Sequence, residues 1–147
     1  MIVLLLGPQG AGKGTQGAIL SKALGIPILG AGDLLREEVG TGSELGKQIK
    51  ALIDKGNLAA PEVVTELLVR RLDKDDARGG VLIDGYPRDA TQLSMMLDRF
   101  TPDVAVILGI DDDTAVKRLG GRWVCKERHI YNIDTNPPKV FGVCDID

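Results

Sequence analysis

Two runs of the chain are apolar at almost every position. The first, Ile2–Leu6, precedes a glycine-rich stretch, and the second, Val81–Asp84, ends on a carboxylate. Continuous apolar runs of this length are typical of strands that are buried on both faces of a parallel sheet. We expect two further strands over residues 26–29 and 104–110, which makes four in all.

Between these runs, apolar residues recur at helical spacing. Helices are predicted over residues 15–24, 33–39, 43–55, 91–99 and 113–119. Another helix is predicted to begin at Pro61, because proline suits the first helical position. Ser43 is a predicted N-cap, and Gly56 a predicted stop. Strands that alternate with helices predict an α/β fold with right-handed crossovers and helices flanking the sheet.

The pattern changes at Gly120. Glycine, proline, asparagine and both cysteines are concentrated in the last stretch, together with short β-like runs at residues 122–125, 129–133 and 139–143. We interpret residues 121–147 as a small β-rich subdomain.

Composition narrows the class of protein. The 147 residues are 44% hydrophobic and 27% charged, which is typical of a soluble globular domain. The formal net charge of −3 shows no basic surplus, so we expect no nucleic-acid partner. The first apolar run is too short to cross a bilayer and lacks the features of an export signal, so we expect no membrane partner and a cytoplasmic location. Two cysteines are too few for a disulfide scaffold, which leaves free thiols or metal ligands.

A predicted phosphate-binding loop follows the first strand. It reads Gly7-Pro8-Gln9-Gly10-Ala11-Gly12-Lys13-Gly14-Thr15 and lies between a strand and a helix. Glycines let backbone N–H groups turn toward phosphate oxygens, and the helix N-terminus adds about half a positive charge. Lys13 is placed to reach the β- and γ-phosphates, and Thr15 to meet phosphate or Mg²⁺. Gly14 is a departure, because Ser or Thr directly follows the lysine in the general pattern.

Four motifs carry a resemblance to a known family. They are Lys13-Gly14-Thr15-Gln16, residues 30–36 (GAGDLLR), residues 84–88 (DGYPR) followed by Gln92, and a last group made of Arg118, Gly121-Arg122, Ile130-Tyr131 and residues 136–139 (NPPK). In this order and at these distances they resemble the nucleoside monophosphate kinases. Within that family the chain is most similar to the adenylate kinases of bacteria, which have a long lid.

The resemblance implies a P-loop kinase that converts ATP and AMP reversibly into two ADP, with Mg²⁺ on the ATP. It implies that Arg36 and Arg88 hold the AMP phosphate, that Asp84 supports Mg²⁺ through water, and that Gln92 pairs with the adenine edge. The expected AMP-binding residues are Ala31, Arg36, Asn57, Leu58, Ala59, Gly85, Tyr86, Pro87, Arg88 and Gln92.

The resemblance also implies an ATP site and a division into subdomains. The expected ATP-binding residues are Gly10, Ala11, Gly12, Lys13, Gly14, Thr15, Arg118, Arg122, Ile130 and Tyr131. Because phosphoryl transfer depends on positioning and charge neutralisation, the expected catalytic set is Lys13, Arg36, Asp84, Arg88, Arg118 and Arg122. The expected divisions are a core of residues 1–29 and 60–120, an acceptor-binding subdomain of residues 30–59 and a lid of residues 121–147. We expect a monomer.

Two departures leave alternatives open. Position 31 carries alanine where adenylate kinases usually carry threonine, which is more like a UMP/CMP kinase. Gln92 and the long lid favour AMP as the acceptor. A complete family member also continues past the lid, so a fragment or a non-catalytic nucleotide-binding remnant is an alternative, with the strand at residues 104–110 left as an open edge. A simple ATPase is a weaker alternative, because it would not need the acceptor motifs.

A structural Zn²⁺ is a further expectation for the lid. The candidate ligands Cys125, His129, Cys144 and Asp147 resemble the four lid ligands of zinc-bearing adenylate kinases. Arg128 stands where the second ligand is usually cysteine, so His129 would have to serve. Sulfur and nitrogen ligands suit tetrahedral Zn²⁺. The alternative is a lid without metal, held by hydrogen bonds.

Overall fold

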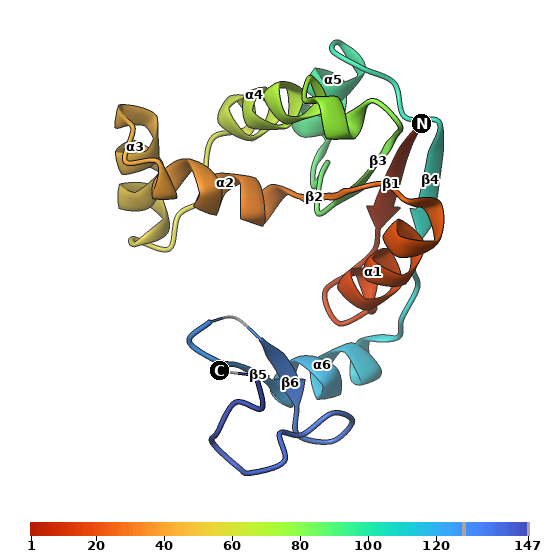
Figure 1. The fold of residues 1–147 in the computed structure, drawn as a ribbon, viewed down its shortest axis with the longest axis vertical. Helices are drawn as coiled ribbons and strands as arrows, with labels where there is room; N and C mark the ends of the chain where they lie inside the picture. Colours follow the sequence, from red (N-terminus) through yellow and green to blue (C-terminus); the bar gives the residue numbers. More distant parts are fainter. Residues whose placement is uncertain (128, 147) are drawn as a thin grey trace. The chain divides into compact units, whose positions relative to one another are not determined.

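A computed structural model describes residues 1–127 and 129–146 (Figure 1). The chain forms two compact units. The first unit comprises residues 1–6 and 13–107, and the second comprises residues 7–12 and those from 108 onward. None of the helices found in the described residues is long and apolar enough to span a membrane.

The first unit is built on a parallel sheet of four strands, in the order β2-β3-β1-β4. The strands are β1 (Ile2–Leu6), β2 (Ile28–Gly30), β3 (Val81–Asp84) and β4 (Val104–Ile107). The expected α/β fold is thereby confirmed, and β1 and β3 have the predicted bounds. β2 begins two residues later than predicted, because the Ile26 N–H bonds instead to the Ser21 carbonyl and Pro27 has no N–H to donate. β4 ends three residues early and lies at the edge of the sheet, as expected.

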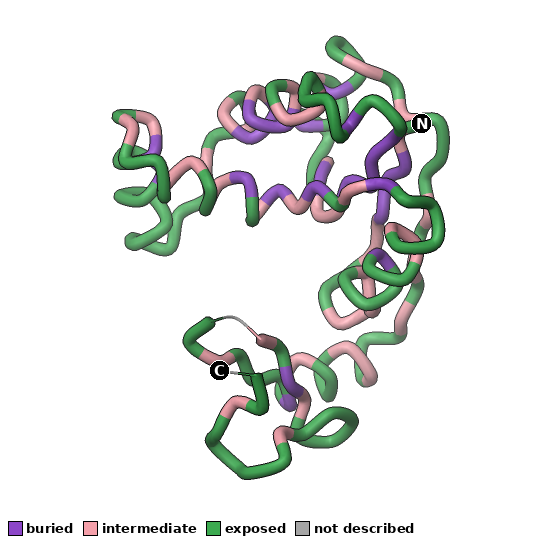
Figure 2. The backbone as a smooth tube through the Cα atoms, in the orientation of Figure 1, coloured by how far each residue is buried: buried purple, intermediate pink, exposed green. Residues whose placement is uncertain are grey.

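Successive residues of β1 and β3 point to opposite faces of the sheet. Helix α1 (Lys13–Leu24) covers one face, where Gly17 is buried and lies against Leu5 and Leu82. The main hydrophobic core includes Leu4 and Ile83, the neighbours of those residues in sequence. This alternation is what a strand with both faces covered requires. Figure 2 shows the buried positions concentrated on β1, β2, β3 and the helix that follows residue 60.

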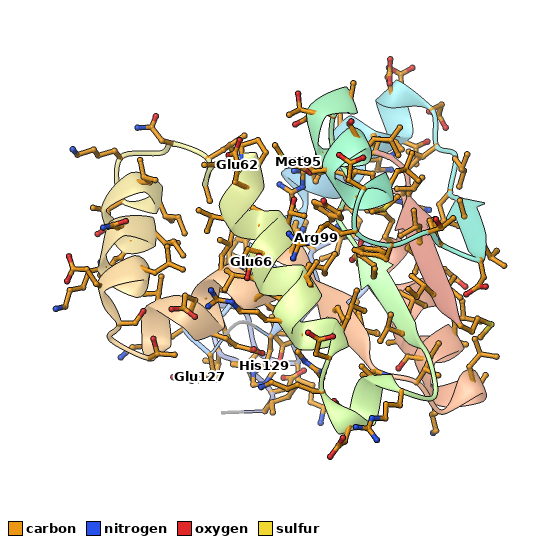
Figure 3. The ribbon with its side chains drawn as sticks, turned by 90° about the horizontal axis from the view of Figure 1, so that it is seen from above. Glu62, Glu66, Met95, Arg99, Glu127 and His129 are labelled. Carbon is orange, nitrogen blue, oxygen red and sulfur yellow. The ribbon has the colours of Figure 1, made fainter. Side chains whose placement is uncertain are left out.

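Two helices complete the main core. They are α4 (Pro61–Leu72) and α5 (Ala90–Leu97), and they contribute the fully buried Leu68 and Met96. Pro61 is the first residue of α4, as predicted. Figure 3 shows the two helices side by side, with Glu66 of α4 facing Arg99 just beyond α5; the carboxylate and guanidinium of that pair lie 3.5 Å apart.

A pair of short helices and one 3₁₀ turn make up the rest of the first unit. They are α2 (Ala31–Gly40), α3 (Glu44–Ile53) and η1 (Asp75–Ala77). The predicted N-cap is confirmed, since the Ser43 hydroxyl accepts the Gly46 N–H at 2.9 Å. Ile49 of α3 is 1% exposed and joins Leu34 of α2 in the main core.

The second unit contains little regular structure. It holds helix α6 (Asp112–Gly120) and an antiparallel pair, β5 (Arg122–Val124) and β6 (Ile130–Asn132). The prediction of a strand at residues 139–143 is wrong. The Val143 N–H donates to the Val140 carbonyl, and Gly142 has a φ of 80°, so the segment forms a turn. Among the described residues after Gly120, only Gly121 and Tyr131 are buried.

Candidate functional site

The loop between β1 and α1 has the backbone of a phosphate-binding loop, and Lys13 begins α1 directly after it. Gly7, Gly10 and Gly12 have positive φ angles of 136°, 84° and 91°. A Cβ atom on Gly7 would lie 2.3 Å from the Leu108 carbonyl oxygen, and one on Gly10 would lie 3.2 Å from that of Ala115. A Cβ on Gly12 would meet no atom of the described residues within 4 Å. The loop is therefore held closely on the side of Gly7 and Gly10 and has open space at Gly12.

Within the second unit, one of the predicted arginines lies against this loop. Nη1 of Arg118, in the last turn of α6, donates to the Gly10 carbonyl at 3.0 Å. Arg122 lies on β5 and is exposed. Ile130 and Tyr131, which were also predicted to bind ATP, differ in exposure. Ile130 is 55% exposed, whereas Tyr131 is buried, with its hydroxyl oxygen 3.2 Å from Cys144 Sγ. Tyr131 is therefore part of the small buried centre of the second unit rather than of its surface.

In the first unit, Asp84 ends β3, at the edge where open α/β sheets bind their ligands. Its Oδ1 atom is buried and has no hydrogen-bond partner within the described part of the chain. Burial raises the pKa of Asp84 above its ordinary value of 3.8, while the positive charges of Lys13 and Arg88 oppose that rise. A buried carboxylate oxygen without a partner, close to cations, fits a hydrated Mg²⁺.

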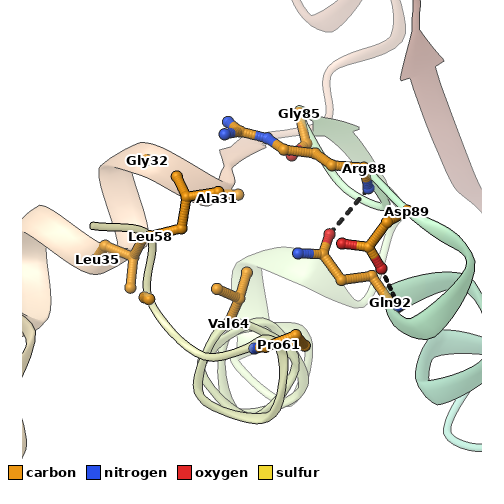
Figure 4. A pocket seen from close by; sticks show the side chains of 11 residues that line it. Ala31, Gly32, Leu35, Leu58, Pro61, Val64, Gly85, Arg88, Asp89 and Gln92 are labelled. Carbon is orange, nitrogen blue, oxygen red and sulfur yellow. Dashed lines mark hydrogen bonds between the residues drawn. The ribbon is translucent and has the colours of Figure 1, made fainter. Parts of the chain in front are cut away.

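A cavity of about 190 Å³ lies in the first unit, close to the end of β3 (Figure 4). It has an apolar side, formed by α2, the segment before α4 and the start of α4. Its other side is polar and is formed by the loop after β3 and by α5. The described lining consists of Ala31, Gly32, Leu35, Leu58, Ala59, Pro61, Val64, Gly85, Arg88, Asp89 and Gln92.

Six of the ten predicted AMP-binding residues line this cavity, namely Ala31, Leu58, Ala59, Gly85, Arg88 and Gln92. The other four, Arg36, Asn57, Tyr86 and Pro87, are not part of the described lining. Arg36 pairs with Asp33, and its guanidinium lies beside Gly32, which does line the cavity. Tyr86 is fully buried, and its hydroxyl donates to the Gln92 carbonyl at 3.1 Å.

Five lining residues were not predicted: Gly32, Leu35, Pro61, Val64 and Asp89. Leu35 and Val64 follow the helical spacing of core residues, so nothing in the sequence separates a pocket wall from a core position. The sequence did contain a signal for Asp89. An aspartate is a common N-cap residue, and this one stands three residues before Gln92, in the first turn of α5. Its Oδ1 atom accepts the Gln92 N–H at 2.8 Å.

Two of the polar side chains that line the cavity, those of Arg88 and Gln92, are oriented by backbone groups. Oε1 of Gln92 accepts the Arg88 N–H at 2.8 Å, and Nε of Arg88 donates to the Gly85 carbonyl, also at 2.8 Å. Figure 4 shows the Arg88 guanidinium extending past Gly85, at a distance from the amide of Gln92. The cavity thus presents a cation in one place and an amide in another, with apolar side chains opposite.

The second unit brings together three of the four predicted metal ligands. The ligand atoms of Cys125, His129 and Cys144 all lie within 4.8 Å of one another. Nδ1 of His129 is 3.3 Å from Cys125 Sγ and 3.4 Å from Cys144 Sγ. Two thiols and an imidazole form a donor set that suits Zn²⁺. The fourth predicted ligand, Asp147, lies outside the described residues.

The comparisons with known proteins agree on one family. The family model for adenylate kinase matches residues 5–141. The adenylate kinase of Streptomyces griseus is 42% identical over 152 aligned positions, which cover 99% of this chain and 69% of that protein. Those of Methanothrix thermoacetophila and Methanococcoides burtonii are 42% and 44% identical, and each alignment covers 99% of this chain and 70% of the relative. The chain thus spans about 70% of the length of these relatives. It belongs to the adenylate kinase family of phosphotransferases.

Proposed function

We propose that the cavity of the first unit binds AMP, and that the loop Gly7–Gly12 with Lys13 binds the phosphates of ATP. The chain is an adenylate kinase, which transfers a phosphoryl group reversibly from ATP to AMP. The observation that carries the assignment of the cavity is its layout. An apolar side suits the faces of a base, the Gln92 amide suits a base edge, and the Arg88 guanidinium suits a phosphate.

The phosphate end of the AMP site would be formed by two arginines. The bond from Nε of Arg88 to the Gly85 carbonyl fixes the plane of its guanidinium, which favours a two-point contact with phosphate. Arg36 reaches the same region beside Gly32 and is paired with Asp33. In this proposal Arg36 exchanges Asp33 for the phosphate, which carries more charge.

Transfer of the phosphoryl group needs no nucleophilic side chain from the protein. The ATP and AMP phosphates repel each other, so the work of the site is to hold them in line and to neutralise their charge. We assign this work to Lys13, Arg36, Arg88, Arg118 and Arg122. Asp84 would hold a hydrated Mg²⁺, which supplies further positive charge at the phosphates when bound. Its buried Oδ1 supports that role.

We also propose the division into a core of residues 1–29 and 60–120, an acceptor-binding subdomain of residues 30–59 and a lid of residues 121–147. The packing of α2 on α3 supports the second part. The lid buries so little that a structural Zn²⁺ on Cys125, His129 and Cys144, with Asp147 as the fourth ligand, would contribute much of its stability.

The setting that we propose is a cytoplasmic monomer with ATP and AMP as its partners and no nucleic acid. A net charge of −3 supports the last point. The grouping of both cysteines as candidate metal ligands supports a reducing compartment, because a metal site of this kind needs thiolates.

The test of this assignment is a coupled assay of ADP formation with Arg88→Ala. Removing the guanidinium should raise KM for AMP and lower kcat/KM by about 100-fold or more, while KM for ATP changes little. Arg78→Ala is the matched control, because Arg78 is an exposed arginine of the same unit and forms an ion pair with nearby Asp75. An unchanged KM for AMP in Arg88→Ala would refute the assignment of the cavity.

A further inference from the structure

Asp89 places a carboxylate in the lining of the cavity, at the end that lies away from the Arg88 guanidinium. We infer that one oxygen of this carboxylate accepts a hydrogen bond from the exocyclic amino group of the acceptor's base. Asp89 is therefore the residue that separates AMP from IMP, which carries a carbonyl group at the same place. This inference rests on the proposed function of the cavity as the acceptor site.

The Asp89 carboxylate has one oxygen bound and one oxygen open. Its Oδ1 atom accepts the Gln92 N–H at 2.8 Å and thereby caps helix α5. Its Oδ2 atom has no hydrogen bond or ion pair within the described part of the chain. Because the cap holds the carboxyl group in place, Oδ2 is an acceptor with a restricted direction, and it belongs to a residue that lines the cavity.

The charges of the cavity give a bound nucleotide one favourable orientation. Figure 4 shows the Asp89 carboxylate turned toward the Gln92 side chain, whereas the Arg88 guanidinium extends away from both, past Gly85. A nucleotide whose phosphate lies at Arg88 places its base at the Asp89 end. The reverse orientation would bring the phosphate close to the carboxylate, and the two anions would repel each other.

The amide at this end of the cavity cannot by itself tell an amino group from a carbonyl group. Gln92 carries both an NH₂ group and a carbonyl oxygen, so it can pair with either kind of base edge. An ionised carboxylate can only accept, and Asp89 is the only carboxylate in the described lining. It gains a charge-assisted hydrogen bond from an amino group and is repelled by a carbonyl oxygen. The choice between the two groups therefore depends on Asp89.

Asp89→Asn should turn the preference toward IMP. Asparagine is also a good N-cap residue, so its Oδ1 atom should still accept the Gln92 N–H. The NH₂ group of the asparagine then takes the place of the open carboxylate oxygen. A donor there suits the carbonyl group of hypoxanthine and opposes the amino group of adenine. We expect kcat/KM for IMP to rise by about tenfold or more and that for AMP to fall by a similar factor, with ATP as donor.

Asp89→Ser separates the reading of the base from the capping of α5. Serine caps helices about as well as aspartate, so Gln92 should keep its place, but serine has no second oxygen for the base. The ratio of kcat/KM for AMP to that for IMP should fall by about tenfold or more, and the melting temperature should change little. Asp111→Ser is the matched control, because Asp111 caps α6 through the same contact, from Oδ1 to the Thr114 N–H at 2.8 Å. It should leave the ratio unchanged.

The outcomes separate this inference from the proposal on which it rests. In the unmodified chain, AMP should exceed IMP by about 100-fold or more in kcat/KM, and equal values would overturn the inference. A ratio that stays unchanged in Asp89→Asn and in Asp89→Ser, in variants that keep their melting temperature, would overturn it as well. In each of these cases Arg88→Ala still raises KM for AMP. If Arg88→Ala has no effect on AMP, the proposed site itself has failed.

Discussion

The hydroxyl oxygens of Thr65 and Tyr86 lie 2.8 Å apart, inside the interface between α4 and the loop that follows β3. Thr65 also contacts the Pro61 carbonyl at 2.8 Å, and Tyr86 contacts the Gln92 carbonyl at 3.1 Å. The two hydroxyl groups thus form a buried chain of hydrogen bonds that runs from the first turn of α4 to the first turn of α5. Both ends of this chain, Pro61 and Gln92, line the candidate AMP cavity.

Tyr86→Phe tests this chain of contacts. The substitution leaves the Thr65 hydroxyl and the Gln92 carbonyl with one partner fewer in a buried place, so we expect a loss of about 1–3 kcal/mol in the free energy of unfolding. KM for AMP should rise, because Gln92 loses one of its supports, while KM for ATP should not. Urea denaturation and steady-state kinetics measure the two effects. A variant that is destabilised but has the unmodified KM for AMP would show that the chain of contacts is only structural.

Asp84→Asn should make the protein more stable and less active at neutral pH. Burial raises the folded-state pKa of Asp84, so the folded chain binds this proton more tightly than the unfolded chain. The contribution of Asp84 to stability is therefore greatest below its ordinary pKa of 3.8, and it falls as the pH rises through the higher folded-state value. Above that value, the buried charge lowers stability.

The measurement for Asp84→Asn is the melting temperature as a function of pH, without Mg²⁺. The gain over the unmodified chain should be full at pH 7 and should shrink toward pH 3.8, the ordinary pKa of an aspartate. Asp73→Asn, at an exposed position after α4, serves as the control and should show no such gain. A lower melting temperature of Asp84→Asn at pH 7 would contradict the prediction.

Cys144→Ser tests the candidate metal site. Replacing one of the grouped ligands should reduce bound zinc from about one equivalent per chain to almost none. It should also lower the thermal stability of the lid. Elemental analysis and the melting profile, each with and without chelator, are the measurements, and Asp134→Asn in the same lid is the control. Chains that carry no zinc before the substitution would refute the site.

Gly7→Ala should prevent the phosphate-binding loop from forming correctly. A Cβ atom there would lie 2.3 Å from the Leu108 carbonyl oxygen, at a φ of 136° that alanine rarely adopts. We expect a loss of about 2 kcal/mol or more in stability, together with weaker ATP binding. Gly40→Ala is the control, since its Cβ would meet nothing within 4 Å among the described residues. At that helical position, alanine should stabilise by about 0.5–1 kcal/mol. Equal stabilities of the two variants would contradict this account of the loop.

Strands β1 and β3 and the helix that begins at Pro61 were predictable because a single local signal determined each of them. β1 and β3 are continuous apolar runs, and Pro61 and Ser43 act at helix ends with little help from distant contacts. The segment 139–143 misled because valine and phenylalanine favour strands by their packing, and no described strand is paired with them. Gly142 adopts a positive φ, which favours a turn over a strand.

The cavity was predictable only where a motif marks it. Arg88 and Gln92 belong to such a motif, whereas Leu35 and Val64 have the spacing of any core residue. Tyr86 shows the opposite problem: it lies within the motif, but its side chain is turned into the core. Whether a motif residue contacts the ligand or supports one that does depends on side-chain direction, and that is set by packing between elements distant in sequence.

Among the described residues after Gly120, Tyr131 has the one buried side chain, and this has a consequence for how the second unit responds to its surroundings. A hydrophobic core of leucine and isoleucine packed on a sheet is destabilised by urea, whereas chelators do not affect its stability. A hairpin whose stability depends on a metal ion held by two thiols and an imidazole, as proposed for this one, has the opposite sensitivities: oxidants, acid and competing chelators should unfold it before denaturant does. In that case the two units of one polypeptide would lose their stability under different conditions, the first in denaturant and the second on thiol oxidation or loss of the metal.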